Sequence, residues 1–422
     1  MTNPATGRRV IEVGSPIVGA AGPAVPKLKR VRPRKIADYP HVPAVYLDAV
    51  EKYASPLMMG PPVCDELVAL VQHLLTEEEA GAVRHLGLVR GRTAAEVAAA
   101  ENRGIDQIGP ILHHLAEEKS CIVASGPEGR QQYRLLPIMP GVFEMVLIRW
   151  TPETMTPWHR RFVELFEALY ETGYSLDYAG AAGGMVRYLP VGRAIDAHPM
   201  ALPTDQLEVV LDRFDTFGVG QCQCRTAART QGHGCDGPLG NCAVMGKWAR
   251  HGIKKGWLRQ VSKREMLDLK REAEALGMVN WMMNVRTSKG QSSCSCCGCC
   301  CHAMRMVSEF NAPGMFAPPH FRPRLEPARC TACGRCAKRC PMKAVAVDPA
   351  ARSYRYLPQR CIGCGQCVLA CERQRALSME PVPCYKLPYK SWFSLLANSV
   401  PGMLRTTWRV WRSRKAAGND AG

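Results

Sequence analysis

Two short runs of cysteine near the C-terminus have a spacing that can hold two metal clusters. In each run four cysteines follow the pattern C-x-x-C-x-x-C-x-x-x-C, over residues 330–340 and 361–371. Three thiolates at such short intervals can wrap one 4Fe–4S cube, whereas the fourth lies too far along the chain to close the same cluster and binds the other one. The spacing therefore assigns one cluster to Cys330, Cys333, Cys336 and Cys371, and the second to Cys340, Cys361, Cys364 and Cys367.

Structural zinc and disulfides are the alternative uses of closely spaced cysteines. Zinc sites usually join two C-x-x-C pairs across a longer loop, rather than four cysteines in eleven residues twice over. Disulfides suit small secreted chains in oxidising compartments, whereas this chain has 422 residues and 21 cysteines, most of them clustered. The pattern therefore favours iron–sulfur clusters in a reducing compartment.

Ten further cysteines between residues 222 and 301 form a second constellation. They fall into two groups, and two helices are predicted between the groups, over residues 241–251 and 262–276. We expect this helical hairpin to bring the groups together as an additional iron–sulfur cluster, with zinc as the alternative because the irregular spacing fits neither standard pattern. The candidate ligands are Cys222, Cys224, Cys235, Cys242, Cys294, Cys296, Cys297, Cys299, Cys300 and Cys301.

Amphipathic helices and a hairpin must precede these cysteine-rich regions. Residues 65–75, a stretch that begins with the Thr93–Glu96 capping box, and residues 106–119 are predicted to be helices, and residues 121–136 a hairpin. This order resembles the winged-helix fold over about seventy residues. The resemblance implies either DNA binding through the third helix or a protein-docking module. We favour docking, because residues 106–119 do not form a basic face.

The fold class expected for the whole chain is α+β with several domains. We expect a disordered basic tail (1–40), a winged-helix-like domain (60–140), a mixed domain (141–320) with a cysteine-rich helical region (222–301), a dicluster ferredoxin domain (321–384) and a basic amphipathic tail (385–422). Residues 326–381 resemble the bacterial two-cluster ferredoxins, including the proline after the first run, Pro341, which Glu372 replaces after the second. Over residues 60–381 the chain is similar to large bacterial and archaeal 4Fe–4S binding proteins, which strengthens the expected architecture more than any particular function.

The charge of the chain bears on its partners and location. Lys and Arg outnumber Asp and Glu by 55 to 37, a formal net charge of +18, which favours an acidic redox protein, an anionic membrane surface or nucleic acid without choosing among them. Acidic redox donor and acceptor proteins are expected, and nucleic acid is not, because residues 106–119 lack a basic face. Residues 385–415 mix aromatic side chains and leucines with arginines, which is typical of a helix in peripheral contact with a membrane or packed on protein. Pro401 and Gly402 are expected to break this helix in two. No run of eighteen apolar residues occurs, and the expected location is the cytoplasm or the inner face of the membrane.

These observations favour electron transfer through iron–sulfur clusters as the function. Two alternatives remain open. One is the catalytic subunit of an iron–sulfur oxidoreductase with its active site in the cysteine region 222–301. The other is a redox-responsive regulator that binds DNA through the winged helix.

Overall fold

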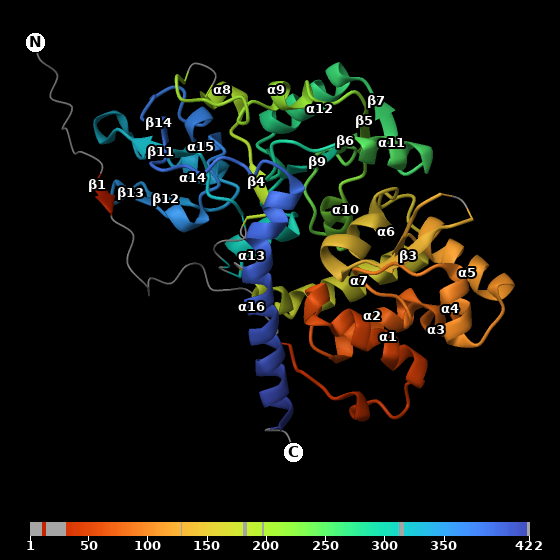
Figure 1. The fold of residues 1–422 in the computed structure, drawn as a ribbon. Helices are drawn as coiled ribbons and strands as arrows, with labels where there is room; N and C mark the ends of the chain where they lie inside the picture. Colours follow the sequence, from red (N-terminus) through yellow and green to blue (C-terminus); the bar gives the residue numbers. More distant parts are fainter. Residues whose placement is uncertain are drawn as a thin grey trace, which may run out of the picture. The chain divides into compact units, whose positions relative to one another are not determined.

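Helices and strands alternate along the chain in the computed structural model, so the expected mixed class is confirmed (Figure 1). The structure describes residues 11–13, 31–127, 129–179, 184–195, 198–310, 312 and 316–419. It divides into two units. The helical unit contains Lys27–Ala181, Gln221–Gly234 and Pro401–Gly422, and the cysteine-rich unit contains Met1–Pro26, Ala182–Gly220 and Cys235–Val400. Of the tail expected to be disordered, residues 1–10 and 14–30 lie outside the described residues, whereas Ile11–Val13 form a strand and Ile36–Asp38 a 3-10 helix.

Helices form most of the helical unit. Two short antiparallel strands, β2 (Ile122–Ser125) and β3 (Gln132–Leu135), make the predicted hairpin. The helices are α1 (Ala44–Ala54), α2 (Asp65–Leu74), α3 (Glu77–Val83), α4 (Ala94–Glu101), α5 (Ile105–Glu117), α6 (Phe143–Leu147), α7 (Pro157–Glu171) and α10 (Gln223–Thr230).

Local capping fixes where several of these helices begin. Thr76 and Thr93 each accept a hydrogen bond from the backbone N–H three residues on, and the glutamate there bonds back to the threonine N–H, so both capping boxes are complete. Helix α5 instead begins after Gly104, and Asp106 lies in its first turn rather than capping it. No break between units falls at residue 140, because α7 packs against α2 in the core of the helical unit.

A four-stranded antiparallel sheet organises one half of the cysteine-rich unit. Its strand order is β7 (Arg259–Val261), β5 (Phe217–Gly220), β6 (Cys242–Gly246) and β9 (Gly290–Ser293). The helix predicted over residues 241–251 is therefore wrong in its first half, because residues 242–246 pair with β9 and only α11 (Lys247–Lys254) is helical. Helix α12 (Lys263–Ala275) follows, with Ser262 as its N-cap.

Smaller elements complete this half of the unit. A three-stranded sheet has the order β10 (Ser295–Cys296), β8 (Val279–Met283) and β4 (Val186–Tyr188). The short helices are α8 (Gly192–Ile195), α9 (Leu207–Leu211) and α13 (His302–Ser308).

The C-terminal part of the same unit repeats one pattern twice. A 3-10 turn, a cysteine run, a short helix and a strand follow one another as Pro327–Arg329, α14 (Arg335–Arg339) and β12 (Val345–Asp348), and again as Pro358–Arg360, α15 (Gln366–Leu369) and β14 (Leu377–Pro381). Strand β14 pairs with β11 (Phe321–Leu325), and β12 pairs with β13 (Ser353–Tyr356), to which β1 (Ile11–Val13) adds in parallel. Each cysteine run therefore lies between a 3-10 turn and a short helix that leads into a strand.

Helix α16 (Trp392–Asn419) ends the described chain as one continuous helix, which corrects the expected break at Pro401. Proline removes one backbone hydrogen bond, but the helix continues on both sides of it. Leu395 and Val410 are buried, whereas Phe393 and Trp408 on the other side are 81% and 58% exposed. In the part of the chain that the structure describes, no helix is both long and apolar enough to cross a membrane.

Candidate metal centres

One cavity is lined by cysteines of both C-terminal runs. Its volume is about 20 Å³, and three of its cysteines come from the first run while the fourth comes from the second. These are the residues that the spacing assigned to one cluster: Cys330, Cys333, Cys336 and Cys371. Burial and the neighbouring thiols, Cys371 first, raise the pKa of Cys336 to about 11. A group bound by these four sulfurs would sit among apolar atoms of Val347, Ala376 and Leu377.

The other four cysteines of the runs also influence one another electrostatically. Burial raises the pKa of Cys364, and charges on Cys340 and Cys361 raise it further. The pKa of Cys367 is raised by burial and then by Cys364, Cys340 and Cys361. Because such effects fall with distance, the sequence-predicted set Cys340, Cys361, Cys364 and Cys367 lies together, with Cys364 and Cys367 buried and the other two half-buried.

Backbone N–H groups point at the sulfurs of both sets. Ala332 donates to Cys330 Sγ at 3.4 Å, Ala344 to Cys340 Sγ at 3.2 Å and Gly363 to Cys361 Sγ at 3.4 Å. Hydrogen bonds to sulfur favour the charged thiolate and are one of the factors that set a cluster's reduction potential. Each of these turns contains a left-handed residue: Ala332 with φ +57°, Lys343 with φ +51° and Gly363. Gly363 has φ +66°, and a Cβ there would lie 2.4 Å from the Phe321 carbonyl oxygen.

Two polar residues, Gln366 and Arg339, tie the runs to the rest of the unit, and the sequence did not single out Gln366. The buried Gln366, which precedes Cys367, accepts a hydrogen bond from Arg339 Nε at 3.0 Å and donates to the Met278 carbonyl at 2.9 Å. Arg339 also donates to the Ala275 carbonyl at 2.6 Å. Helices α14, α15 and α12 are therefore held together beside the cavity.

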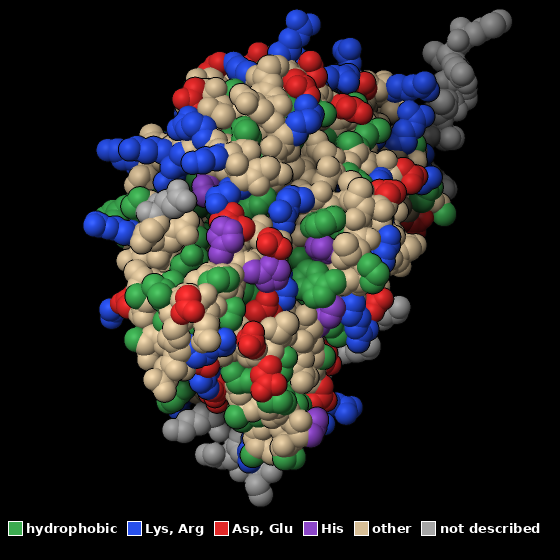
Figure 2. Space-filling view, turned by 90° about the vertical axis from the view of Figure 1, so that its right-hand side faces the viewer, with side chains coloured by type: hydrophobic (Ala, Val, Ile, Leu, Met, Phe, Trp, Pro, Cys, Tyr) green, Lys and Arg blue, Asp and Glu red, His purple; other side chains and the backbone are tan. Residues whose placement is uncertain are grey.

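A wide groove of about 1100 Å³ adjoins the cavity, since Arg335 and Ala370 line both. Five cationic and three anionic side chains line it: Arg193, Arg271, Arg335, Lys338, Arg339, Glu208, Glu274 and Glu372. Arg193 pairs with Glu372 at 2.7 Å, so the glutamate that replaces the usual proline takes part in an ion pair. Arg335 and Lys338 form no ion pair with the described residues. On the face drawn in Figure 2, Lys and Arg side chains are spread widely with carboxylates among them.

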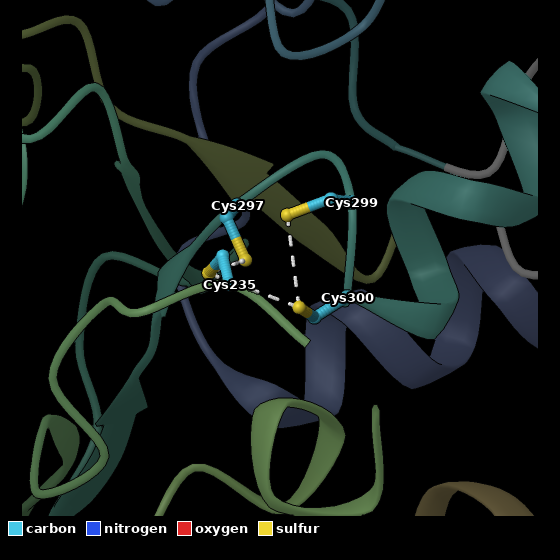
Figure 3. A group of neighbouring side chains, drawn as sticks. All are labelled: Cys235, Cys297, Cys299 and Cys300. Carbon is cyan, nitrogen blue, oxygen red and sulfur yellow. Dashed lines mark hydrogen bonds between the residues drawn. The ribbon is translucent and has the colours of Figure 1, made fainter. Parts of the chain in front are cut away.

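Four of the middle cysteines converge on one point. The sulfurs of Cys235, Cys297, Cys299 and Cys300 all lie within 4.8 Å of one another, and their side chains point toward a common centre (Figure 3). We call them the tight four. Thiol donors from Cys297, Cys299 and Cys300 lower the pKa of Cys235, whereas Cys235 and Cys297 raise the pKa of Cys299 and of Cys300, so the negative charge is favoured on Cys235.

Four others form a second, looser set, which we call the buried set: Cys242, Cys294, Cys296 and Cys301. The register of β6 against β9 places Cys242 beside Cys294, with sulfurs 3.5 Å apart. Lys270 is fully buried next to this set, and its ammonium donates to the Ser293 carbonyl at 2.6 Å. Burial lowers the pKa of Lys270, and the cysteines Cys294, Cys242 and Cys296 oppose that shift.

The expected route by which the middle cysteines meet is corrected by this arrangement. A sheet, rather than a helical hairpin, brings residue 242 to residue 294, because backbone pairing fixes which residues face each other across strands. Cys222 and Cys224 belong to the helical unit, where Cys222 is the N-cap of α10. All 21 cysteines lie in the described part of the chain, and none forms a disulfide there.

The middle cysteines pack directly on the second site of the C-terminal runs. Cys296 and Cys301 share one apolar cluster with Cys364, and Cys340 and Cys361 border it. Gly298 lies between Cys297 and Cys299 in the sequence and close to the first run, because a Cβ on it would be 2.0 Å from the Pro341 carbonyl oxygen. The cysteine sites therefore form a contiguous series within one unit.

Comparison with known families agrees with this geometry at the C-terminus. Residues 322–372 match the family described as a 4Fe–4S dicluster domain. The expected C-terminal dicluster domain is thereby confirmed for that segment. No curated protein and no solved structure matches the chain.

Proposed function

We propose that the protein transfers electrons, and that two 4Fe–4S clusters bind at the C-terminal runs in a two-cluster ferredoxin fold. The observation that carries this is the cavity in which Cys371 of the second run joins three cysteines of the first. Such exchange of the fourth ligand is characteristic of two-cluster ferredoxins. When bound, the clusters supply one-electron redox chemistry. The residues of the chain hold them, exclude water and adjust their potential.

The surroundings of both sites favour reduction. Amide groups donate to Cys330, Cys340 and Cys361, and the groove beside the first cavity has a positive balance of charge. Donors and cations stabilise the extra negative charge of a reduced cluster, so each should raise the potential.

The groove is the surface where we place the redox partner. It reaches the cavity at Arg335 and Ala370, so a protein docked there would approach the first cluster closely. Arg335 and Lys338 have no ion pair among the described residues, whereas Arg339 is engaged by hydrogen bonds, so these two remain available to carboxylates of an acidic partner. Electrostatic complementarity of this kind mainly increases the rate of association.

We place the additional cluster expected from the sequence at the buried set, because its four sulfurs, unlike those of the tight four, do not all lie within 4.8 Å of one another. Thiolates carry negative charge into the interior, and the buried ammonium of Lys270 beside Cys294 and Cys242 offsets part of it. The shared apolar packing with Cys364 gives a short path from this centre to the second cluster. Electrons would then pass from the buried set, through the two clusters, to the groove.

Helix α16 suggests where the carrier works. Exposed apolar side chains recur every three or four residues along it, and Arg412 stacks on Trp408 at 4.6 Å. They are Phe393, Leu396, Val400, Leu404, Trp408 and Trp411. An apolar stripe flanked by arginines fits a helix lying on an anionic membrane surface. We infer peripheral attachment at the inner face, with residues 60–140 serving as a winged-helix docking module.

Paired substitutions test the assignment of ligands. Cys330→Ser and Cys371→Ser should each alter the same cluster, so the double variant should show the EPR spectrum and the iron and sulfide loss of either single variant. Cys340→Ser should alter the other cluster, so its combination with Cys330→Ser should lose both signals. Cys384→Ser, at an exposed cysteine outside the runs, is the matched control. If Cys371→Ser instead added its loss to that of Cys330→Ser, the exchange of fourth ligands would be wrong.

A further inference from the structure

The tight four has the dimensions of a site for one metal ion. Cys235 Sγ lies 3.6 Å from Cys297 Sγ and 3.9 Å from Cys300 Sγ, and Cys299 Sγ lies 3.6 Å from Cys300 Sγ. These separations are far longer than the roughly 2.05 Å of a disulfide. With metal–sulfur bonds of about 2.3 Å, tetrahedral geometry puts neighbouring sulfurs about 3.8 Å apart. The observed distances fall on both sides of that value.

A cubic cluster requires a different arrangement of sulfurs. Each of its thiolates binds a separate iron, so the four sulfurs must stand apart around a space that the cluster fills. The four cysteines at the first cavity do so, because they line one cavity from the two runs and their sulfurs do not all come within 4.8 Å of one another. The same chain thus contains both kinds of arrangement, and the tight four is the compact kind.

We propose that Cys235, Cys297, Cys299 and Cys300 bind a single tetrahedral metal ion, Zn²⁺ or Fe²⁺, rather than an iron–sulfur cluster. A tetrahedral set of four soft thiolate ligands is typical of sites for zinc or iron. This inference does not depend on the proposed electron transfer, because it rests on sulfur geometry outside the dicluster segment.

The ion would act as a clasp between distant parts of the chain. Cys235 lies on the segment before β6, whereas the other three ligands lie on the loop after β10, 62 residues or more away. Joining them closes a long loop, and a metal that binds only the folded chain stabilises that fold. The loop so fixed is the one that touches Pro341, beside the second cluster's Cys340.

The test measures zinc, iron and acid-labile sulfide in the full-length protein purified without oxygen. Wild type should contain one ion per chain that Cys235→Ser loses while sulfide stays unchanged, and Cys384→Ser should keep it. Cys299→Ser, at the exposed ligand, serves as the second variant in case Cys235→Ser does not fold. Loss of one zinc identifies Zn²⁺, whereas loss of one iron with a mononuclear high-spin ferric EPR signal after oxidation identifies Fe²⁺.

Two results would overturn the proposal. If sulfide fell together with metal in both variants, the tight four would hold a cluster. If neither zinc nor iron changed in either variant, it would hold no metal. Iron and EPR signals of the dicluster segment, recorded on the same samples, show separately whether the C-terminal clusters are present.

Discussion

Substitution of Gly298 by alanine should weaken the contact between the middle cysteines and the second cluster site. The new Cβ would lie 2.0 Å from the Pro341 carbonyl oxygen, and since such contacts are essentially never below 3.0 Å, the two segments must separate by at least 1.0 Å. Pro341 follows Cys340 directly, so the displacement moves a proposed cluster ligand. Overpacking of this kind costs about 1–3 kcal/mol.

The expected result is a lower unfolding temperature and a perturbed cluster. At about 2–4 °C per kcal/mol for a unit of roughly 150–250 residues, the midpoint should fall by about 2–12 °C. The EPR signal that Cys340→Ser alters should change as well. Gly240→Ala is the matched control, because it lies in the same unit with nothing within 4 Å of its added Cβ. If both variants melted alike and kept the same spectra, the loop would not rest on Pro341 and the reasoning would fail.

Three other perturbations test separate features. Arg335→Glu with Lys338→Glu should slow reduction by an acidic partner by about tenfold or more at low salt, and the difference should shrink at high salt; an unchanged rate at low salt would move the docking site elsewhere. Leu404→Ser with Trp408→Ser should weaken binding to anionic liposomes by roughly tenfold or more without changing iron content, and equal binding would refute the membrane role of α16. Burial, and then the charge of Arg149, lowers the pKa of His159 from 6.5 to about 4. Between these two pH values the unfolded chain binds a proton that the folded chain does not, so the free energy of unfolding should decrease as the pH is lowered from 6.5 to 4. Thermal unfolding should show this decrease in wild type and a smaller one in His159→Phe.

Local chemistry was predicted well from the sequence. The capping boxes at Thr76 and Thr93 depend only on residues three positions apart, and both form. The spacing of the C-terminal cysteines likewise encodes a short local wrap, and the family comparison confirms a dicluster domain there. Such features can be predicted because the chain need not fold globally to define them.

Long-range pairing accounts for most of what the sequence missed. Residues 242–246 have apolar side chains that suit a helix or a strand, and the partner strand β9 lies more than forty residues away. The division of the middle cysteines depends on that register, so spacing alone could not provide it. Lys270 carried no signal, because a lysine in an amphipathic helix is ordinarily exposed.

Between Cys294 and Cys301 the chain changes from one sulfur set to the other twice, at 296–297 and at 300–301. Inserting or deleting a single residue here would move cysteines of one set into the positions of the other, so the length of this loop cannot change without disrupting both sets. The same layout suggests an order of maturation. An ion captured by residues 297, 299 and 300 would hold Cys296 and Cys301 at a fixed separation on either side, and the more elaborate cofactor would then be built into a frame that a simple ion had already set.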